Sequence, residues 1–264
     1  MTAVSLADGI PLPMKRRGVA NWVRSYLAML RWDMTNTRLM IPILAFAQAI
    51  SGAGLVLGFG LLIPSLPPLV AAYLVTGAAV VTLIMVGAAV GPQLVAQQKM
   101  EGSYDFMWSL PVPRSAAAMS WVTLNAIIAV PGMVAALVAG ALRFDVSFAI
   151  TPMVVPAVLI TIVSGTLLGY ALSHAIPKPE VTLLVSQILI FVIFGFAPIA
   201  FPAENLPSWM ATTHQYLPFV HMANIIRDSL VDGIATDVAH SYLVLAIWSV
   251  VAIAVSAAVL RRRK

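Results

Sequence analysis

The sequence predicts an all-α integral membrane protein with six transmembrane helices, an amphipathic interfacial helix before them, and an outer re-entrant helical segment between spans five and six. Three observations predict this class. Hydrophobic residues make up 61% and charged residues 9% of the chain, whereas soluble domains average about 45–50% and about 25%. Six apolar runs reach the roughly 20 residues that a membrane-spanning helix requires. Most lysines and arginines flank these runs, as in membrane proteins of fixed orientation.

The first element is a helix over residues 21–38, within a cytoplasmic region of residues 1–40. Arg24, Arg31 and Arg38 are seven residues apart on one face, while Trp22 and Tyr26 lie elsewhere around the helix. This pattern is typical of a helix that lies in the membrane interface, with its arginines toward anionic headgroups of membrane lipid. The basic run at residues 15–17 has no apolar core after it and is not a cleavable signal peptide.

The six spans form a membrane domain over residues 41–264. They are predicted over residues 41–63, 69–96, 116–142, 148–172, 181–200 and 242–260. With both termini in the cytoplasm, thirteen of the fifteen basic residues lie inside and two, Arg143 and Arg227, lie outside. The thirteen are Lys15, Arg16, Arg17, Arg24, Arg31, Arg38, Lys99, Arg114, Lys178, Arg261, Arg262, Arg263 and Lys264. This distribution follows the positive-inside rule.

Small residues four apart let membrane helices approach closely, and three glycine pairs have this spacing. They are Gly54 with Gly58, Gly87 with Gly91, and Gly165 with Gly169. Scattered amides and hydroxyls in the spans are more often used for hydrogen bonds between helices than for substrates. Pro131 and Pro156 are expected to kink or loosen their helices.

The loop over residues 97–114 is the charged interruption between the second and third spans. Gly102 offers a turn, Ser103 is a plausible N-cap for a helix through Ser109, and Pro111 and Pro113 prevent its continuation. The residues at i, i+3 and i+4 on that helix form an apolar stripe, consisting of Tyr104, Met107 and Trp108. The pattern alone is compatible with a loop resting on the lipid surface and with a helix that docks in a partner's groove.

The long segment over residues 201–241 is too apolar for a solvated loop. Pro202, Pro207 and Pro218 divide it into short pieces, and Pro207 suits the first turn of a helix that Asn205 caps. A second helix is predicted around residues 221–231. Irregular backbone at membrane depth must be packed against protein, so these pieces are expected to fold back against the spans.

Several kinds of chemistry are missing from the chain. There is no Gly-x-x-x-x-Gly-Lys-Ser/Thr loop for nucleotide phosphates and no His-Glu-x-x-His, and the absence of cysteine excludes disulfides and thiol catalysis. The predicted spans hold no acidic, basic or histidine residue, which disfavours an ion-coupled carrier. His174, His214, His221 and His240 all fall outside the predicted spans. We therefore expect no catalytic, cofactor-binding or metal-binding residue and no nucleic-acid partner, so that any driving force comes from another subunit.

The order of these parts resembles the membrane subunit of ATP-binding-cassette exporters of the second type, the ABC-2 permeases of drug, antibiotic and polysaccharide efflux. The resemblance spans nearly the whole chain. It rests on the interfacial helix, the six spans, Glu101-Gly102-Ser103 followed by Pro111-Val112-Pro113-Arg114, and Leu-Pro-Ser-Trp-Met before the sixth span. Ser103 stands where threonine is commoner in the family.

The resemblance implies roles for four groups of residues. The helix over residues 102–110 would be the ATPase-coupling element, with the helix over 21–38 beside it. The residues of the coupling element are Glu101, Gly102, Ser103, Tyr104, Asp105, Met107, Trp108, Leu110, Pro111 and Arg114. The interfacial helix contributes Trp22, Arg24, Tyr26, Arg31 and Arg38. The dimer or pathway candidates are Gln48, Gly54, Gly58 and Gln187, and the outer re-entrant gate contains Leu206, Pro207, Trp209 and Pro218.

The resemblance also implies partners. These are two copies of an ABC ATPase subunit carrying ATP and Mg, and a second permease chain, identical or homologous, in a bacterial plasma membrane. Because the spans carry no fixed charge, we expect an amphipathic or hydrophobic substrate such as a drug, antibiotic or lipid. The alternatives are a non-transporting membrane scaffold or assembly protein, and an ion-coupled secondary carrier.

Overall fold

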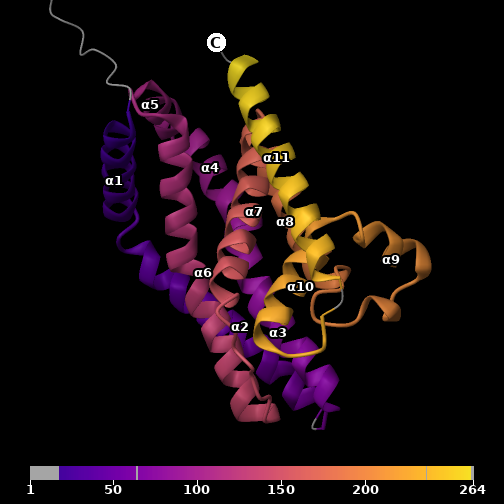
Figure 1. The fold of residues 1–264 in the computed structure, drawn as a ribbon. Coiled ribbons are helices and arrows are strands. Elements are labelled where there is room, and N and C mark those ends of the chain that lie inside the picture. The colour runs from indigo at the N-terminus through magenta and orange to yellow at the C-terminus, as the bar shows by residue number, and fades with distance from the viewer. Residues whose placement is uncertain (1–17, 64, 236, 263–264) are drawn as a thin grey trace, which may run out of the picture.

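The computed structural model describes residues 18–63, 65–235 and 237–262, and every regular element in these ranges is helical (Figure 1). The elements are α1 (Val19–Asn36), α2 (Met40–Leu62), α3 (Pro68–Met85), η1 (Val86–Val90), α4 (Gly91–Met100), α5 (Ser103–Ser109), α6 (Arg114–Phe144), α7 (Val154–Ala175), α8 (Pro179–Gly195), η2 (Ala203–Asn205), α9 (Ser208–His214), α10 (Pro218–Leu230) and α11 (Val238–Arg262). Lys15, Arg16, Arg17, Arg263 and Lys264, which the prediction of orientation uses, lie outside the described residues.

Five helices among the described residues are long and apolar enough to cross a membrane. They are Met40–Leu62, Pro68–Met100, Arg114–Phe144, Val154–Ala175 and Val238–Val255. The second combines α3, η1 and α4, and α6 continues through Pro131 as one helix. These five correspond to five of the six predicted spans.

The remaining predicted span, over residues 181–200, is a shorter apolar helix of 17 residues, α8. It ends at Gly195, where the N–H groups of Phe196 and Ala197 both donate to the carbonyl of Val192. The chain turns here because its backbone packs on α3: a Cβ added to Gly77 would lie 2.4 Å from the Cα of Ala200. The predicted span was therefore too long, since the apolar run continues into this turn.

The helix Pro68–Met100 is at the centre of the bundle. In its most apolar stretch 78% of the residues are buried, against 11% in α2 and 17% in α11. It contacts α2, α6, α7, α8 and α10. The most apolar run of the chain therefore faces other helices, while α2 and α11 expose most of their apolar surface.

Two of the predicted glycine pairs face each other across the interface between this central helix and α7. A Cβ added to Gly169 would lie 2.0 Å from the carbonyl oxygen of Gly87, and a Cβ added to Gly87 would lie 2.6 Å from the backbone nitrogen of Thr166. Only glycine permits this approach of the two backbones. Around Gly54 and Gly58, by contrast, an added Cβ would meet nothing within 4 Å.

The central helix contains one irregularity that the sequence reasoning missed. Residues Val86–Val90 form a π-helical turn, in which the N–H of Gly91 donates to the carbonyl of Val86. Pro92 follows directly, and a proline inside a helix lacks the N–H donor and crowds the carbonyl four residues earlier. A widened turn before Pro92 relieves that crowding, and such turns are frequent at functional sites.

The two ends of the bundle carry different elements. The helix α5 and the C-terminal end of α11 lie at one end, which we call the α5 end (Figure 1). The turn between α2 and α3 lies at the opposite end, where α10 packs against α3, α7 and α11 (Figure 1). We call this the α10 end.

Candidate functional site

The helix α5 ends at Ser109 as predicted but begins one residue earlier than predicted. The residue before it is Gly102, whose φ of 77° is left-handed, a conformation that glycine adopts without steric penalty. Ser103 is the first helical residue rather than the predicted N-cap, and its hydroxyl donates to the carbonyl of Gln98 at 3.3 Å. At the other end Leu110 is extended and Pro111 follows, which stops the helix.

Most predicted coupling residues lie on the surface. Glu101, Gly102, Ser103, Pro111 and Arg114 are exposed, Leu110 is half-buried and Tyr104 is buried. The side chains of Asp105, Met107 and Trp108 lie outside the described part of the structure. Phe106 is 55% exposed, and its ring centroid is 6.4 Å from that of Trp32, which brings α1 beside α5.

A group of contacts that the sequence reasoning missed joins the end of α4 to the end of α7, and Tyr104 of α5 packs against both. Lys99 donates to the carbonyls of Ser173 at 2.5 Å and Ile176 at 2.9 Å, and its ammonium lies 5.3 Å from the centre of the Tyr104 ring. The last carbonyls of a helix have no intrahelical donor and carry partial negative charge, so a cation stabilises them. The Tyr104 ring also lies 5.8 Å from that of His174. We call this group of contacts the Lys99 joint.

His174 belongs to the last turn of α7 and His240 to the first turn of α11, both candidate spans, so the placement of these two histidines outside the spans was wrong. His174 is buried, its ring lies 3.9 Å from that of Tyr170, and its Nδ1 contacts the carbonyl of Tyr170 at 2.7 Å. Polar aromatic residues near the end of an apolar run are the sequence signal that marks this region.

The helix α1 packs against α6 through three polar contacts. Trp22 donates to the Ser115 hydroxyl at 2.9 Å, and the Tyr26 hydroxyl lies 2.9 Å from that of Thr123. The hydroxyl of Ser120 donates to the buried carboxyl of Asp33 at 2.5 Å. Burial raises the pKa of Asp33 above its ordinary value, and the Ser120 hydrogen bond opposes that rise. Arg24 and Arg31 of α1 are exposed, and so is Arg38, which lies in the turn after α1 because the helix ends at Asn36 and not at Arg38 as predicted.

The predicted dimer or pathway residues have different surroundings. Gly54 and Gly58 have open space around them, and Gln187 is exposed on α8. Gln48 is half-buried, and its carbonyl oxygen lies 2.8 Å from where a Cβ on Gly132 of α6 would be. The first three therefore lie on surfaces that the described residues leave open, whereas Gln48 belongs to the contact between α2 and α6.

The predicted outer gate is formed by η2, α9 and α10. Leu206 is half-buried, and Pro207 and Trp209 are exposed on and beside α9. Pro207 directly precedes α9, and Asn205 ends the short η2 turn rather than capping α9 as predicted. Pro218 is buried and is the first residue of α10, where a proline is well tolerated.

The most deeply buried cation among the described residues is Arg227 on α10, with 2% of its surface exposed. Its guanidinium donates to the carbonyl of Ile199 at 2.7 Å and to Thr76 Oγ1 and Asn224 Oδ1 at 3.3 Å each. Its Cζ lies 4.0 Å from the centre of the Tyr73 ring. We call this group the Arg227 joint, because it connects α10 to α3 and to the turn after α8.

The positive charge of Arg227 is stabilised by neutral polar and aromatic groups. Burial lowers the pKa of its guanidinium to about 10, so the group remains protonated at neutral pH. The neighbouring Asp228 is exposed, in agreement with the expectation that adjacent helical residues diverge. Carbonyl, hydroxyl, amide and aromatic partners replace the water that a buried cation loses. Sequence reasoning missed this site, although a cation on an otherwise apolar helix face is a usable signal.

His221 makes a second polar contact of α10. Its Nε2 lies 2.8 Å from the carbonyl of Gln215 and its Nδ1 lies 3.0 Å from the Ser241 hydroxyl at the start of α11. Burial lowers its pKa below the ordinary value, which the Gln215 hydrogen bond opposes. The neutral ring with its hydrogen on Nε2 satisfies both contacts.

These features define the class of protein. An all-helical, multi-pass membrane chain carries a short bounded helix at one end and a folded-back helical segment toward the other. Residues 39–258 match the family model described as ABC-2 family transporter protein, so the chain belongs to this family and is a membrane subunit of an ABC transporter. Comparison with curated proteins gave no significant match.

Proposed function

We propose that the chain is the permease subunit of an ATP-binding-cassette exporter. Two permease chains, identical or homologous, form the pathway, and two copies of a separate ATPase subunit energise it with ATP and Mg. The substrate is amphipathic or hydrophobic, because the middle of the spans carries no fixed charge that would match an ionic cargo. The single observation that carries the proposal is α5, a short helix with a glycine and prolines at its boundaries, exposed on one side and attached to the bundle on the other.

The attachment supports a coupling role for α5. An exposed helix transmits force only if its contacts to the spans are firm. Tyr104 of α5 is buried against Lys99 of α4 and His174 of α7, and Lys99 in turn donates two hydrogen bonds to carbonyls at the end of α7. Phe106, 55% exposed, offers an aromatic surface for an ATPase groove. Nucleotide-driven closure of the ATPases would pull on α5 and shift the spans between inward and outward arrangements.

The proposed orientation places the α5 end and both termini in the cytoplasm of a bacterial plasma membrane. In this arrangement α8 is the fifth of six crossings. Its 17 residues extend about 25 Å, a little less than the roughly 30 Å of the hydrocarbon core. The turn at residues 196–200 then lies inside the outer leaflet, where packing on α3 satisfies the requirement that such backbone be covered by protein.

The α9 and α10 segment acts in this proposal as the outer gate. Leu206, Pro207, Trp209 and Pro218 mark its breaks and its exposed apolar surface. Gly54, Gly58 and Gln187 are proposed to meet the second chain, since small residues with open space around them suit close helix packing.

A matched pair of glycine substitutions tests the proposal. Gly102 and Gly233 both have positive φ, 77° and 74°, and a Cβ on either would meet nothing within 4 Å. Alanine at either site therefore imposes similar backbone strain, about 1 kcal/mol. In membranes from cells co-expressing the ATPase of the same operon, we expect Gly102→Ala to reduce substrate-stimulated ATP hydrolysis at least fivefold and Gly233→Ala to leave it nearly unchanged.

The same experiment separates the alternatives. A scaffold protein predicts no substrate-stimulated hydrolysis for the unsubstituted chain, and an ion-coupled carrier predicts gradient-dependent flux in liposomes that contain this chain alone. Either result, or failure of any ATPase to co-purify, contradicts the proposed function.

A further inference from the structure

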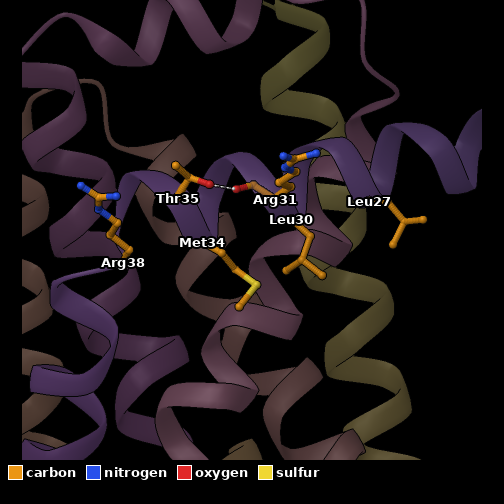
Figure 2. A pocket seen from close by; sticks show the side chains of 6 residues that line it. All are labelled: Leu27, Leu30, Arg31, Met34, Thr35 and Arg38. Atoms are coloured by element: carbon orange, nitrogen blue, oxygen red, sulfur yellow. Dashed lines mark hydrogen bonds between the residues drawn. The ribbon is translucent and has the colours of Figure 1, made fainter.

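A shallow, open depression with a volume of about 460 Å³ lies along α1, on residues other than Trp32, which contacts α5. Its lining comes from α1 and the turn that follows it, and consists of Leu27, Leu30, Arg31, Met34, Thr35 and Arg38 (Figure 2). The lining combines three apolar side chains, two guanidinium groups and one hydroxyl, and none of the six residues is acidic.

The two kinds of side chain are separated in space. In Figure 2 the side chains of Leu27, Leu30 and Met34 lie on the lower side of α1, the guanidinium group of Arg31 lies on its upper side, and Arg38 lies beyond its left end. Leu27 is 54% and Met34 40% exposed, so this apolar surface is not covered by the described chain. The site is therefore an apolar surface with a guanidinium group at two of its borders.

The polar groups nearby leave the arginines available. Asp33, the acidic residue of α1, is buried on the opposite side, where its carboxyl accepts the hydrogen bond of Ser120. Thr35 donates its hydroxyl hydrogen to the carbonyl of Arg31, as the dashed line in Figure 2 shows, at 2.7 Å. Within the described residues no hydrogen bond or ion pair of the Arg31 or Arg38 guanidinium groups competes with an external anion.

We propose that this depression binds one anionic phospholipid, with its phosphate on Arg31 and Arg38 and an acyl chain along Leu27, Leu30 and Met34. A guanidinium group presents paired N–H donors that match phosphate oxygens. The apolar side chains favour an anion that carries hydrocarbon over a free phosphate, since burying hydrocarbon against them removes apolar surface from water. The proposal depends on α1 lying at the membrane surface and is independent of transport.

The bound lipid would stabilise α1 against α6. The contacts of Trp22, Tyr26 and Asp33 lie on the packed side of α1, and the lipid occupies the other side. Charge near an anionic membrane surface contributes about 1 kcal/mol per arginine, so each arginine of the site corresponds to about a fivefold change in lipid affinity.

The test uses the full chain purified from vesicles that contain equal amounts of phosphatidylglycerol and phosphatidylcholine. Native mass spectrometry measures how much of each lipid remains bound. We expect the unsubstituted protein to retain phosphatidylglycerol selectively, and Arg31→Gln with Arg38→Gln to reduce that selectivity at least tenfold. Arg24→Gln is the matched control, because Arg24 is an exposed arginine of α1 that does not line the depression.

Two outcomes overturn the proposal. If Arg24→Gln lowers the selectivity as much as the double variant does, the effect is general surface charge and not a site. If short-chain glycerophosphoglycerol competes as well as the long-chain lipid, the depression binds a headgroup or free phosphate only. The lipid comparisons on the unsubstituted protein decide the question even if the double variant does not fold, since equal retention of both lipids also contradicts the site.

Discussion

The Lys99 joint and the Arg227 joint hold a cation in the same way at opposite ends of the bundle. In each, the cation donates to backbone carbonyls and lies near a tyrosine ring. They differ in burial, because Arg227 is 2% exposed whereas Lys99 is half-buried. A half-buried cation can exchange its carbonyl partners for water at small cost, and a fully buried one cannot. The comparison indicates that the contacts of Lys99 beside α5 can separate at small cost, whereas those of Arg227 beside α10 cannot. We call the Arg227 joint the locked joint.

The largest expected effect comes from removing the locked cation. We expect Arg227→Met to lower the free energy of unfolding by about 3 kcal/mol, since it removes the cation–π contact and leaves the Ile199 carbonyl buried without its donor. The midpoint of thermal unfolding in detergent measures this. Arg24→Met, which changes an exposed arginine, should change the midpoint little. Equal midpoints for the two variants would contradict the locked joint.

The next effect concerns the helix packing next to the Lys99 joint. Gly169→Ala places a Cβ 2.0 Å from the carbonyl of Gly87, and we expect a loss of about 2 kcal/mol from the forced separation of α7 from the central helix. Gly165→Ala is the control one turn away, because its Cβ would lie 3.6 Å from the nearest atom, an ordinary contact. The same thermal unfolding measurement applies, and a Gly165→Ala loss as large as that of Gly169→Ala would show that the close approach is unimportant.

Removing the half-buried cation should affect coupling more than stability. We expect Lys99→Met to lower the free energy of unfolding by only about 1 kcal/mol, because Lys99 and Ile176 are half-buried and water can replace the lost donor at the Ile176 carbonyl. ATP hydrolysis stimulated by substrate should fall several-fold, since Tyr104 of α5 loses the cation that connects it to the end of α7. Lys178→Met, at an exposed lysine before α8, serves as control. A destabilisation as large as that of Arg227→Met would remove the distinction between the two joints.

The smallest effect is a pH response of opposite sign at the two ends. The pKa of Asp33 is raised from 3.8 by burial, so its contact with α6 weakens as pH rises above that value. The pKa of His221 is lowered from 6.5 by burial, so its contribution is present above pH 6.5 and is lost as pH falls below it. Hydrogen exchange, corrected for its intrinsic pH dependence, should show residues 218–230 loosening between pH 7.5 and 5.5 while residues 19–36 do not. His221→Asn should abolish the response.

Local features of the sequence predicted much of the fold. The boundaries of α5 followed from Gly102 and Pro111, and the apolar runs placed the long helices to within a few residues. The end of α8 was missed because the apolar run continues through the turn at residues 196–200, and hydropathy alone does not distinguish a helix from an apolar turn. The start of α7 was placed too early because residues 149 and 151 pair with the end of α10 before the helix begins.

The joints could not be predicted for a different reason. Lys99 and Ser173 are 74 residues apart, and Arg227 and Thr76 are 151 apart. Such contacts depend on which helices become neighbours, which periodicity does not specify. The glycine pairs were predictable as motifs, but the sequence did not indicate that Gly87 would meet Gly169 while Gly54 and Gly58 stay open.

The continuous helix Pro68–Met100 carries parts of both joints, Tyr73 and Thr76 near one terminus and Lys99 near the other. From Thr76 to Lys99 the helix is about 35 Å long, at a rise of 1.5 Å per residue, and it connects the two joints. Its π-helical turn at Val86–Val90 lies between the two attachment points. Under the proposed function, a displacement of the helix end beside α5 would reach α10 through this one helix, and the π-helical turn is the place between them where the regular helical hydrogen bonding is interrupted.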